Sequence, residues 1–489
     1  MSLSERISRG VKAFLGARLI YVASNAVLLF LLTRYLLDPG DYGLLYFAIS
    51  VLSIGSMFGT LGLPKATGRY IAEYSASDEM QIPHIIRISL AVLVALTIVV
   101  GAVIVLIHTQ LADLLGNPAV APLLLIGSGY VAARALFTYL TNVFQGFNRV
   151  EYSAVISAVN GGGRVLFAVL FVVLGFGATG ALAGYLTGYL AAAAVGFYVL
   201  KNNVLIGYDR ATERAAGLKR RILEYSIPTA ATRVSVILDS RVDKIIIGAL
   251  IGPVAVGYYT LAAQIADFCI APATSLGFTI SPAIGEQSAG DDADRAATLY
   301  ERSMENILLL YLPAAVGLLL VAEPAVRIIF GTDYLGAVPV LQLFSVFIIV
   351  RAIHKITGNG LDYLGLARIR AIARGTTAIG NVVLNFALIP PFGVVGAAIA
   401  TLVTYSTYTA VNVYYIHREL DLRVDYLLRQ CGRISVIALV MGGTVSLVIP
   451  HVSGFLSLFG AVLTGIVVWG ILSIASGLLD LAEVRSFLA

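Results

Sequence analysis

Eight basic side chains fall inside segments that are otherwise apolar enough to cross a membrane. They are Arg18, Arg134, Arg164, Arg233, Arg241, Lys244, Arg351 and Lys355. A charged side chain at the centre of a transmembrane helix costs roughly 2.5–3.5 kcal/mol on insertion scales. We expect a chain with so many of them to use them to line a polar cavity. A cationic cavity inside a membrane protein suggests an anionic cargo.

Depth within the apolar segments separates these cations. Arg164 and Arg233 lie near the middle of their segments, from which a side chain cannot reach water by extending along the helix. The other candidates lie closer to an end, where such an extension is feasible. The residues predicted to line the cavity and bind the cargo are Arg18, Arg134, Arg164, Arg233 and Arg351. For Arg164 and Arg233 the alternative is a buried pair with a carboxylate, and for Arg18, Arg134 and Arg351 it is extension of the side chain to water.

Two further groups of charges accompany the arginines. Residues 239–244 carry Asp239, Arg241, Asp243 and Lys244, whose basic and acidic side chains fall on neighbouring faces of a helix. Their ion pairs could break and re-form as an outer gate, or stay fixed as an interfacial cluster. Asp267 lies in the middle of the next apolar segment. It either balances the charge of an arginine or binds a coupling H⁺ or Na⁺, because a desolvated carboxylate can titrate near neutrality.

The composition is that of a polytopic membrane protein. The 489 residues are 58% hydrophobic and 12% charged, with a mean hydropathy of +0.89, whereas soluble domains carry about 25% charged residues. The net charge of +5 fits basic cytoplasmic loops, and no basic arm with interleaved aromatics suggests nucleic acid. The two cysteines and five histidines lack metal-site spacing, so neither a metal nor a cofactor is predicted.

The predicted fold class is all-α, with about fourteen transmembrane helices. A span needs about 20 mostly apolar residues. The approximate limits are 12–34, 42–63, 88–108, 119–141, 150–175, 178–201, 222–248, 254–280, 304–325, 336–356, 367–389, 394–416, 431–450 and 456–479. Basic residues gather in 64–87, 201–221 and 417–433, which all follow even-numbered spans, so both termini are predicted to be cytoplasmic in a multi-pass protein of the cell membrane.

The two halves of the sequence resemble each other. Pro39 matches Pro253 and Gly43 matches Gly257, both at an offset of 214. Gly177 matches Gly393 and Tyr189 matches Tyr405, both at an offset of 216. A unit of six spans returns the chain to the same side, which predicts two lobes in a parallel repeat. The predicted organisation is a first lobe at 1–201, a basic linker at 202–221, a second lobe at 222–416 and an added span pair at 417–489.

Several short motifs resemble a known family. The second-half motif is the run Asp243–Gly248 followed by Gly252, Pro253, Gly257, Tyr258, Tyr259 and Ala262, and the first-half counterpart is Leu37–Gly43 with Leu61–Pro64 and Arg69. They are similar to the signatures of polysaccharide-biosynthesis flippases, in the superfamily that also holds the multidrug and toxin exporters. The resemblance covers essentially the whole chain, and because its motifs are mostly Gly, Pro and apolar positions, it specifies the fold better than the substrate.

The resemblance implies a fourteen-helix flippase for a polyprenyl-linked anionic oligosaccharide. Family members hold the lipid phosphate or pyrophosphate with cations in a central lumen, and an ion gradient would drive alternating access. Membrane lipid and glycan-assembly enzymes are the other expected partners, and enzymatic activity is not expected. The alternatives are a multidrug or metabolite exporter of the same superfamily and, in another class, a membrane-embedded glycosyltransferase or polymerase. Short outer loops without paired carboxylates argue against the enzyme.

Overall fold

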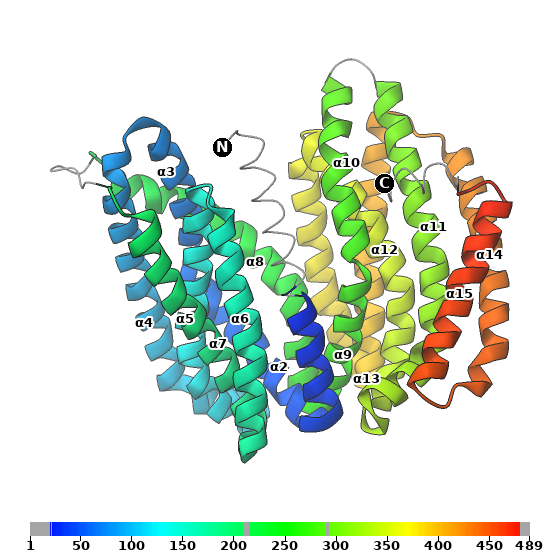
Figure 1. The fold of residues 1–489 in the computed structure, drawn as a ribbon, viewed down its shortest axis with the longest axis horizontal. Coiled ribbons are helices and arrows are strands. Elements are labelled where there is room, and N and C mark those ends of the chain that lie inside the picture. The colour runs from blue at the N-terminus through cyan, green and yellow to red at the C-terminus, as the bar shows by residue number, and fades with distance from the viewer. Residues whose placement is uncertain (1–19, 21, 209–214, 290–292, 480–489) are drawn as a thin grey trace. The chain divides into compact units, whose positions relative to one another are not determined.

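The computed structural model describes residues 20, 22–208, 215–289 and 293–479, with the backbone alone at 231–240, 278, 288–289 and 293. Every element in this described part of the chain is a helix (Figure 1), so the predicted all-α class is confirmed. The chain divides into two compact units, the first at Met1–Gly257 and the second at Tyr258–Ala489.

The first unit contains the helices up to the start of α9. After the apolar helix Val22–Leu36, its long helices are α2 (Pro39–Thr60), α3 (Leu63–Ser77), α4 (Ile82–Leu114), α5 (Ala121–Gly146), α6 (Val150–Phe171), α7 (Gly177–Val199) and α8 (Leu218–Leu250). Helix α2 starts where it does because the Asp38 carboxylate accepts a hydrogen bond of 2.9 Å from the backbone N–H of Asp41, and Pro39 fits the first turn.

The second unit contains the remaining helices. Helix α9 (Pro253–Cys269) continues into it and is followed by α10 (Ala271–Ala289), α11 (Ala293–Ala325), α12 (Val338–Tyr363), α13 (Ala367–Leu420), α14 (Val424–Val448) and α15 (Phe455–Ala475). Helix α13 is a hairpin, because Gly393 breaks it with φ 59° and ψ −142°. The two arms lie against each other, and the Asn381 amide donates to the Thr404 hydroxyl at 3.3 Å.

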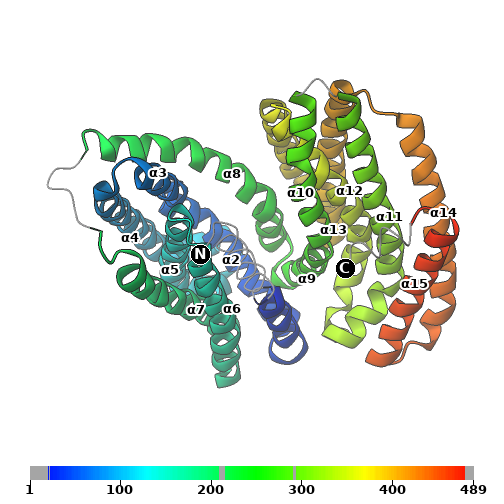
Figure 2. The same ribbon diagram turned by 45° about the horizontal axis from the view of Figure 1, so that its top comes forward.

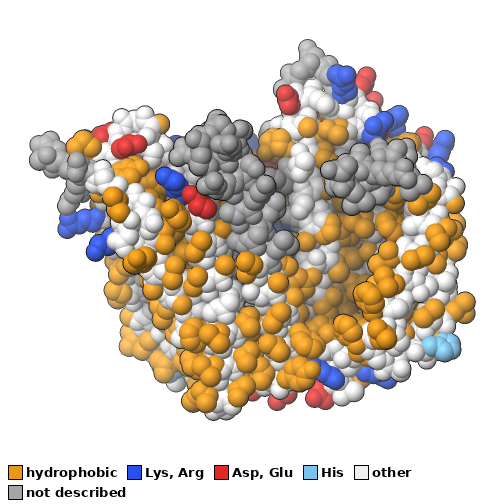
Figure 3. All heavy atoms as spheres, viewed as in Figure 1, with side chains coloured by type: hydrophobic (Ala, Val, Ile, Leu, Met, Phe, Trp, Pro, Cys, Tyr) orange, Lys and Arg blue, Asp and Glu red, His pale blue; other side chains and the backbone are white. Residues whose placement is uncertain are grey.

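Many of these helices can cross a membrane. Among the described residues, nine helices are long and apolar enough by length and composition, or ten if the bent pair α9 and α10 forms one span. Two of the nine, Val150–Val204 and Ala367–Leu420, each contain a glycine break. Large apolar side chains such as Leu106 and Leu456 are exposed on helix flanks. Figure 3 shows hydrophobic side chains over the flanks and charged ones gathered near the helix ends. The chain is a multi-pass membrane protein.

Helix α8 packs within the first unit. It contacts α2, α3 and α4, and Figure 2 shows it running beside α3. Its first turn is tied to α3, since Arg221 forms an ion pair of 2.9 Å with Glu73 and its carbonyl accepts from the Tyr70 hydroxyl at 3.1 Å. The contacts divide the units at 257/258, after α8, whereas the second lobe is predicted from the sequence to start at residue 222. The predicted lobe limits stay predictions.

The element bounds repeat at the offsets found in the sequence. Helix α2 starts at Pro39 and α9 at Pro253, which reproduces the offset of 214. Helices α5 and α12 have equal lengths of 26 residues, and their first residues are related by an offset of 217. The hairpin breaks also correspond, because Gly177 has φ 49° and ψ −136°, close to the values of its repeat equivalent Gly393. Only glycine adopts such a conformation readily, which explains why both positions carry it.

A clasp fastens the last two helices to α11. The Glu301 carboxylate, which is 1% exposed, accepts from the backbone N–H of Arg423 at 2.6 Å and from its Nε at 2.9 Å. One turn further along, Glu305 accepts from the Gln430 amide at 2.9 Å. Helix α15 is held by Trp469, whose indole N–H donates to a carbonyl of α11 at 3.0 Å. We call the contacts of Glu301 and Glu305 with the start of α14 the α11–α14 clasp.

Candidate functional site

Arg164 is buried at the centre of the first unit. Its side chain on α6 is 5% exposed, and its Nη2 donates to the Asn25 side-chain oxygen at 3.0 Å. The guanidinium carbon lies 5.2 Å from the centre of the Tyr185 ring on α7. Gly188 permits this approach, because a Cβ at that position would lie 2.7 Å from Arg164 Cγ. The close packing of α6 and α7 therefore fixes where the guanidinium points.

A pair of tyrosines extends from Arg164 toward α8. The Tyr185 and Tyr46 hydroxyls are 3.0 Å apart, and Lys244 Nζ lies 6.0 Å from the centre of the Tyr46 ring. Lys244 is 9% exposed and its neighbour Asp243 5% exposed, so α8 buries both signs of charge here. Ammonium and guanidinium groups are attracted to the negative faces of tyrosine rings by about 0.5–2 kcal/mol. The two tyrosines thus bridge two buried cations from different helices.

Arg134 extends the same group on the side of α5. Its Nη1 donates to the Ser53 hydroxyl on α2 at 3.2 Å and to the Tyr130 hydroxyl at 3.4 Å. Arg241 of α8 is within electrostatic range of both Arg134 and Tyr130, and of Tyr46. The first unit therefore gathers four cations around shared tyrosines. We call Arg134, Arg164, Arg241 and Lys244 the first-unit cation cluster.

The first-unit cation cluster holds four cations, and the carboxylate of Asp243 is buried next to Lys244 in the chain. A group with more cations than carboxylates attracts an anion, and the attraction is stronger at the effective dielectric of a protein than in water. Arginine presents donors in a planar fork that matches phosphate, and lysine adds a point charge. The phenolic hydroxyls supply further donors for phosphate or sugar oxygens. The chemistry of the first-unit cation cluster therefore suits a phosphorylated ligand.

The second unit holds charges of both signs. Arg351 on α12 pairs with Asp267 on α9, its Nη1 lying 2.6 Å from the Asp267 carboxylate, and its guanidinium lies 5.4 Å from the Phe347 ring centre. The Asp267 side chain is 61% exposed and that of Arg351 20% exposed. This pairing is the arrangement expected of charge balance. Whether Asp267 also binds a coupling ion stays a prediction.

Arg370 and Arg374, which are not among the predicted site residues, lie close to predicted cations in the second unit. Together with Arg351 and Lys355 they lie within electrostatic range of the buried His354. Arg370 donates to the Gly358 carbonyl at 3.0 Å and also pairs with Asp362. Because both arginines stand at the start of a predicted span, they look like ordinary cytoplasmic loop charges. Their spacing of four residues, which places them on one helix face, is the signal that could have found them.

The predicted site residues therefore fall into three groups. Arg134, Arg164, Arg241 and Lys244 come together in the first unit, with Asp243 buried next to Lys244 in the chain, and Arg351 and Asp267 come together in the second. Arg18 lies outside the described residues, as do the side chains of Arg233 and Asp239 on α8. Over the part of the chain with described positions, no group of three or more His, Cys, Asp or Glu residues could hold a metal ion.

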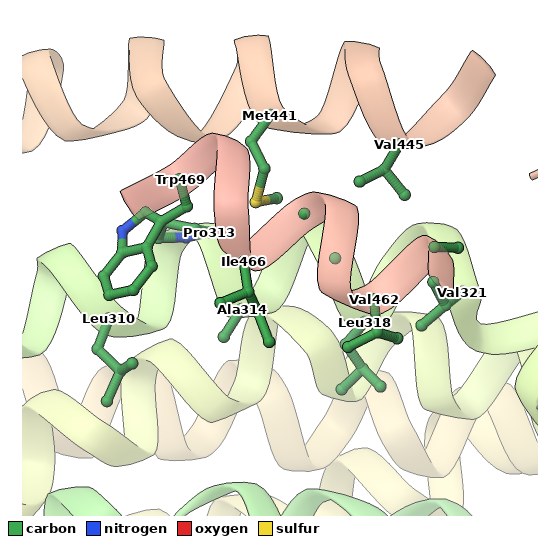
Figure 4. Close-up of a pocket in the computed structure, with 13 residues that line it drawn as sticks. Leu310, Pro313, Ala314, Leu318, Val321, Met441, Val445, Val462, Ile466 and Trp469 are labelled. Carbon is green, nitrogen blue, oxygen red and sulfur yellow. The ribbon is translucent and has the colours of Figure 1, made fainter. Parts of the chain in front are cut away.

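An apolar cavity of about 330 Å³ lies between α11, α14 and α15 (Figure 4). Figure 4 shows Trp469 at one end of it, with Met441, Val445 and Ile466 along its length. No charged side chain is among its lining residues. The indole N–H of Trp469 already donates to a carbonyl of α11, and the other lining side chains are apolar, so this cavity is unsuited to an anionic group. The cavity shows that α15 leaves unfilled apolar space where it packs against α11 and α14.

A protein-family model described as polysaccharide biosynthesis protein matches residues 9–284, which is more than half of the chain. A second model, MatE, matches residues 228–406. The probable low-salt glycan biosynthesis flippase Agl15 of Haloferax volcanii is 26% identical over 46% of this chain and 47% of its own length, so the chain spans about half of that relative. The lipopolysaccharide biosynthesis protein WzxC of Escherichia coli is 24% identical over 76% of this chain and 72% of its own.

Solved structures with the same fold are also found. The lipid II flippase MurJ in an inward closed conformation has a TM-score of 0.73 at 16% identity and covers 95% of this chain and 97% of its own. A multidrug resistance MATE family transporter in an inward-facing conformation has a TM-score of 0.67 at 16% identity, over 84% of this chain and 95% of its own. At this level of identity, both matches establish the fold.

Proposed function

Because the chain belongs to the polysaccharide biosynthesis protein family, we propose that it is a flippase that moves a lipid-linked oligosaccharide across a membrane. The observation that carries the proposal is the first-unit cation cluster. Gathering four cations from three helices around shared tyrosines is costly inside a membrane protein, and a bound anion would offset that cost. A polyprenyl phosphate or pyrophosphate supplies that anion in the middle of a membrane.

The proposed cycle follows from where each part of the cargo is soluble. The phosphate binds the first-unit cation cluster, with Arg351, Arg233 and Arg18 as further candidates. The sugar stays in the polar lumen, and the polyprenyl chain stays in the hydrocarbon of the bilayer. Alternating access then exposes the lumen to each side in turn. The chain itself forms and breaks no covalent bond in this scheme.

The proposed topology completes the scheme. It has fourteen spans, grouped as two parallel six-span lobes plus a final pair, in the cytoplasmic membrane with both termini in the cytoplasm. The basic loops support this orientation. The group Asp239, Arg241, Asp243 and Lys244 is proposed as the outer gate. Asp267 is proposed to accept H⁺ or Na⁺ when it separates from Arg351, which would couple the cycle to an ion gradient. Glycan-assembly enzymes would deliver the cargo.

An exporter of the multidrug type is the second candidate. It is favoured by the MatE model over residues 228–406 and by the shared fold with MATE transporters. The flippase is the better supported function, because the polysaccharide-biosynthesis model matches more of the chain and several relatives are named as flippases or as lipopolysaccharide biosynthesis proteins. Efflux of cationic dyes by the purified protein, without flipping, would reverse this order.

The test is a flipping assay with purified protein in proteoliposomes. A fluorescent polyprenyl pyrophosphate oligosaccharide is placed in both leaflets, and the fraction accessible to an external quencher is followed in time. We expect Arg164→Gln to slow flipping by about tenfold or more, because a buried charged donor to the phosphate is lost. Arg327→Gln is the matched control, since Arg327 pairs with Glu323 and is 55% exposed. Wild-type flipping by Arg164→Gln would overturn the proposed role of the cluster.

A further inference from the structure

The first unit contains a compact arrangement of one cation and three rings. The Arg134 guanidinium carbon lies 6.0 Å from the centre of the Tyr130 ring. Tyr130 packs edge-on against Tyr189 at 5.6 Å, and Phe137 also packs against Tyr189, with a distance of 5.3 Å between ring centres. Ser53 accepts from Arg134. Tyr189 of α7 is thus the ring that Tyr130 and Phe137 of α5 both contact.

The second unit contains the same arrangement. The Arg351 guanidinium carbon lies 5.4 Å from the centre of the Phe347 ring. Phe347 packs edge-on against Tyr405 at 5.2 Å, and His354 lies 5.3 Å from Tyr405. Asp267 pairs with Arg351. Tyr405 of α13 is therefore contacted by Phe347 and His354 of α12, as Tyr189 is contacted by two rings of α5.

All five positions correspond through the internal repeat. The pairs are Arg134 and Arg351, Tyr130 and Phe347, and Phe137 and His354, each at an offset of 217, Tyr189 and Tyr405, at an offset of 216, and Ser53 and Asp267, at an offset of 214. These offsets are those of the helix bounds, so the contacts occupy equivalent places in the two units. Packing alone would accept many apolar substitutes here. Both copies keep a guanidinium beside an aromatic ring that in turn packs against a tyrosine, which indicates a ligand with both polar and flat apolar surface.

We propose that Tyr189 and Tyr405 are equivalent sugar-stacking rings, one in each unit, and that Arg134 and Arg351 donate to hydroxyls of the stacked sugars, while the charge of Arg134 also contributes to phosphate binding in the first-unit cation cluster. This inference rests on the proposed flippase function and names which rings touch the glycan. The C–H face of a pyranose is weakly positive and packs on the negative face of an aromatic ring. The neighbouring guanidinium offers fixed donors to the hydroxyls at the edge of the sugar. Both tyrosines are only half-buried, which leaves ring surface for contact.

The two sites differ in charge at one position, Ser53 in the first and Asp267 in the second, and this difference suits them to different parts of the glycan. Where the first unit has the neutral Ser53, the second has Asp267, whose carboxylate both balances Arg351 and can accept a hydrogen bond from a hydroxyl. The second site is therefore suited to an uncharged sugar. The first site adjoins Arg241 of the first-unit cation cluster and is suited to the sugar attached to the phosphate.

The test compares two lipids that differ only in the sugar. Full-length protein in nanodiscs is titrated with bare polyprenyl pyrophosphate and with polyprenyl pyrophosphate carrying an N-acetylglucosamine disaccharide. We expect Tyr189→Leu and Tyr405→Leu each to weaken binding of the glycosylated lipid by about five- to tenfold, the size of one aromatic contact. Binding of the bare lipid should not change. Tyr→Phe at either position should bind both lipids as the wild type does, because the ring remains.

Tyr198→Leu on α7 is the matched control, since Tyr198 is 67% exposed and outside both sites. Tyr→Gln is the second non-aromatic variant if a leucine variant does not elute as a folded monodisperse species. Equal loss for both lipids, or no loss for the glycosylated one, would overturn the assignment of the rings while leaving the flippase in place. A wild-type protein that binds neither lipid would instead overturn the proposed function itself.

Discussion

Ser53→Asp should give the arginine of the first-unit site the same carboxylate partner that Arg351 has in the second. Ser53 accepts from Arg134 at 3.2 Å, and the equivalent carboxylate of Asp267 lies 2.6 Å from Arg351. A new carboxylate about 3 Å from the Arg134 guanidinium would gain roughly 5 kcal/mol at an effective dielectric of about 20. Burial at a position that is 2% exposed would offset several kcal/mol of this gain. The free energy of unfolding should therefore change little.

The effect on anion binding should be much larger than the effect on stability. Once Arg134 is balanced by a carboxylate, an incoming phosphate meets one positive charge fewer. We expect the affinity for bare polyprenyl pyrophosphate to fall about 10- to 100-fold, which is about 1.4–2.8 kcal/mol. The assay is a nanodisc titration at two salt concentrations, and the salt dependence should weaken in the variant because fewer charges attract the lipid.

Two neutral variants separate charge from shape in this test. Ser53→Asn retains an acceptor for Arg134, and Ser53→Ala removes one hydrogen bond, which is worth about 1 kcal/mol. Both should bind the lipid within about fivefold of the wild type. If Ser53→Asp bound as tightly as the wild type, or if Ser53→Ala were as weak as Ser53→Asp, the electrostatic reasoning for Arg134 would be refuted.

Two predictions concern stability. Glu301→Gln should lower the free energy of unfolding by about 2–4 kcal/mol, because a buried carboxylate of the α11–α14 clasp loses its charge. Thermal unfolding in detergent measures this change. The control is Glu224→Gln, in an exposed ion pair, which should change the free energy of unfolding by less than about 1 kcal/mol. Gly188→Ala should lower the melting temperature and slow flipping, since the new Cβ would lie 2.7 Å from Arg164 Cγ. Gly162→Ala, whose Cβ would have nothing within 4 Å, should leave the melting temperature unchanged or raise it slightly. Equal effects within either pair would contradict the packing described here.

The helices could be predicted from sequence because hydropathy and length determine them directly. The hairpin breaks at Gly177 and Gly393 fall in the short links predicted between spans. The repeat could also be found, since Gly and Pro at helix ends survive divergence. The 33-residue length of α8 and its packing against α3 could not be predicted from sequence, because they depend on contacts between distant parts of the chain, such as that of Arg221 with Glu73.

The cations of the candidate site could be identified from the sequence, but the residues that surround them could not. Sequence identifies Arg164 as deep in a span, but it does not indicate that Asn25 and Tyr185 surround it, since these partners come from other helices. The pairing of Asp267 with Arg351 was one of several open choices. Arg370 was missed because a basic residue at a span end has an ordinary explanation in the positive-inside rule.

The α11–α14 clasp has a consequence for shortened forms of this chain. A protein ending near residue 420 would keep every element of the internal repeat and lose only the last two helices. It would also strip Glu301 and Glu305 of their donors and uncover the apolar side of α11 that α15 now shields. Such a truncation would leave two acidic side chains without these hydrogen-bond donors and would expose an apolar surface of α11. The last two helices therefore stabilise α11, and the chain could not lose them without cost to its stability.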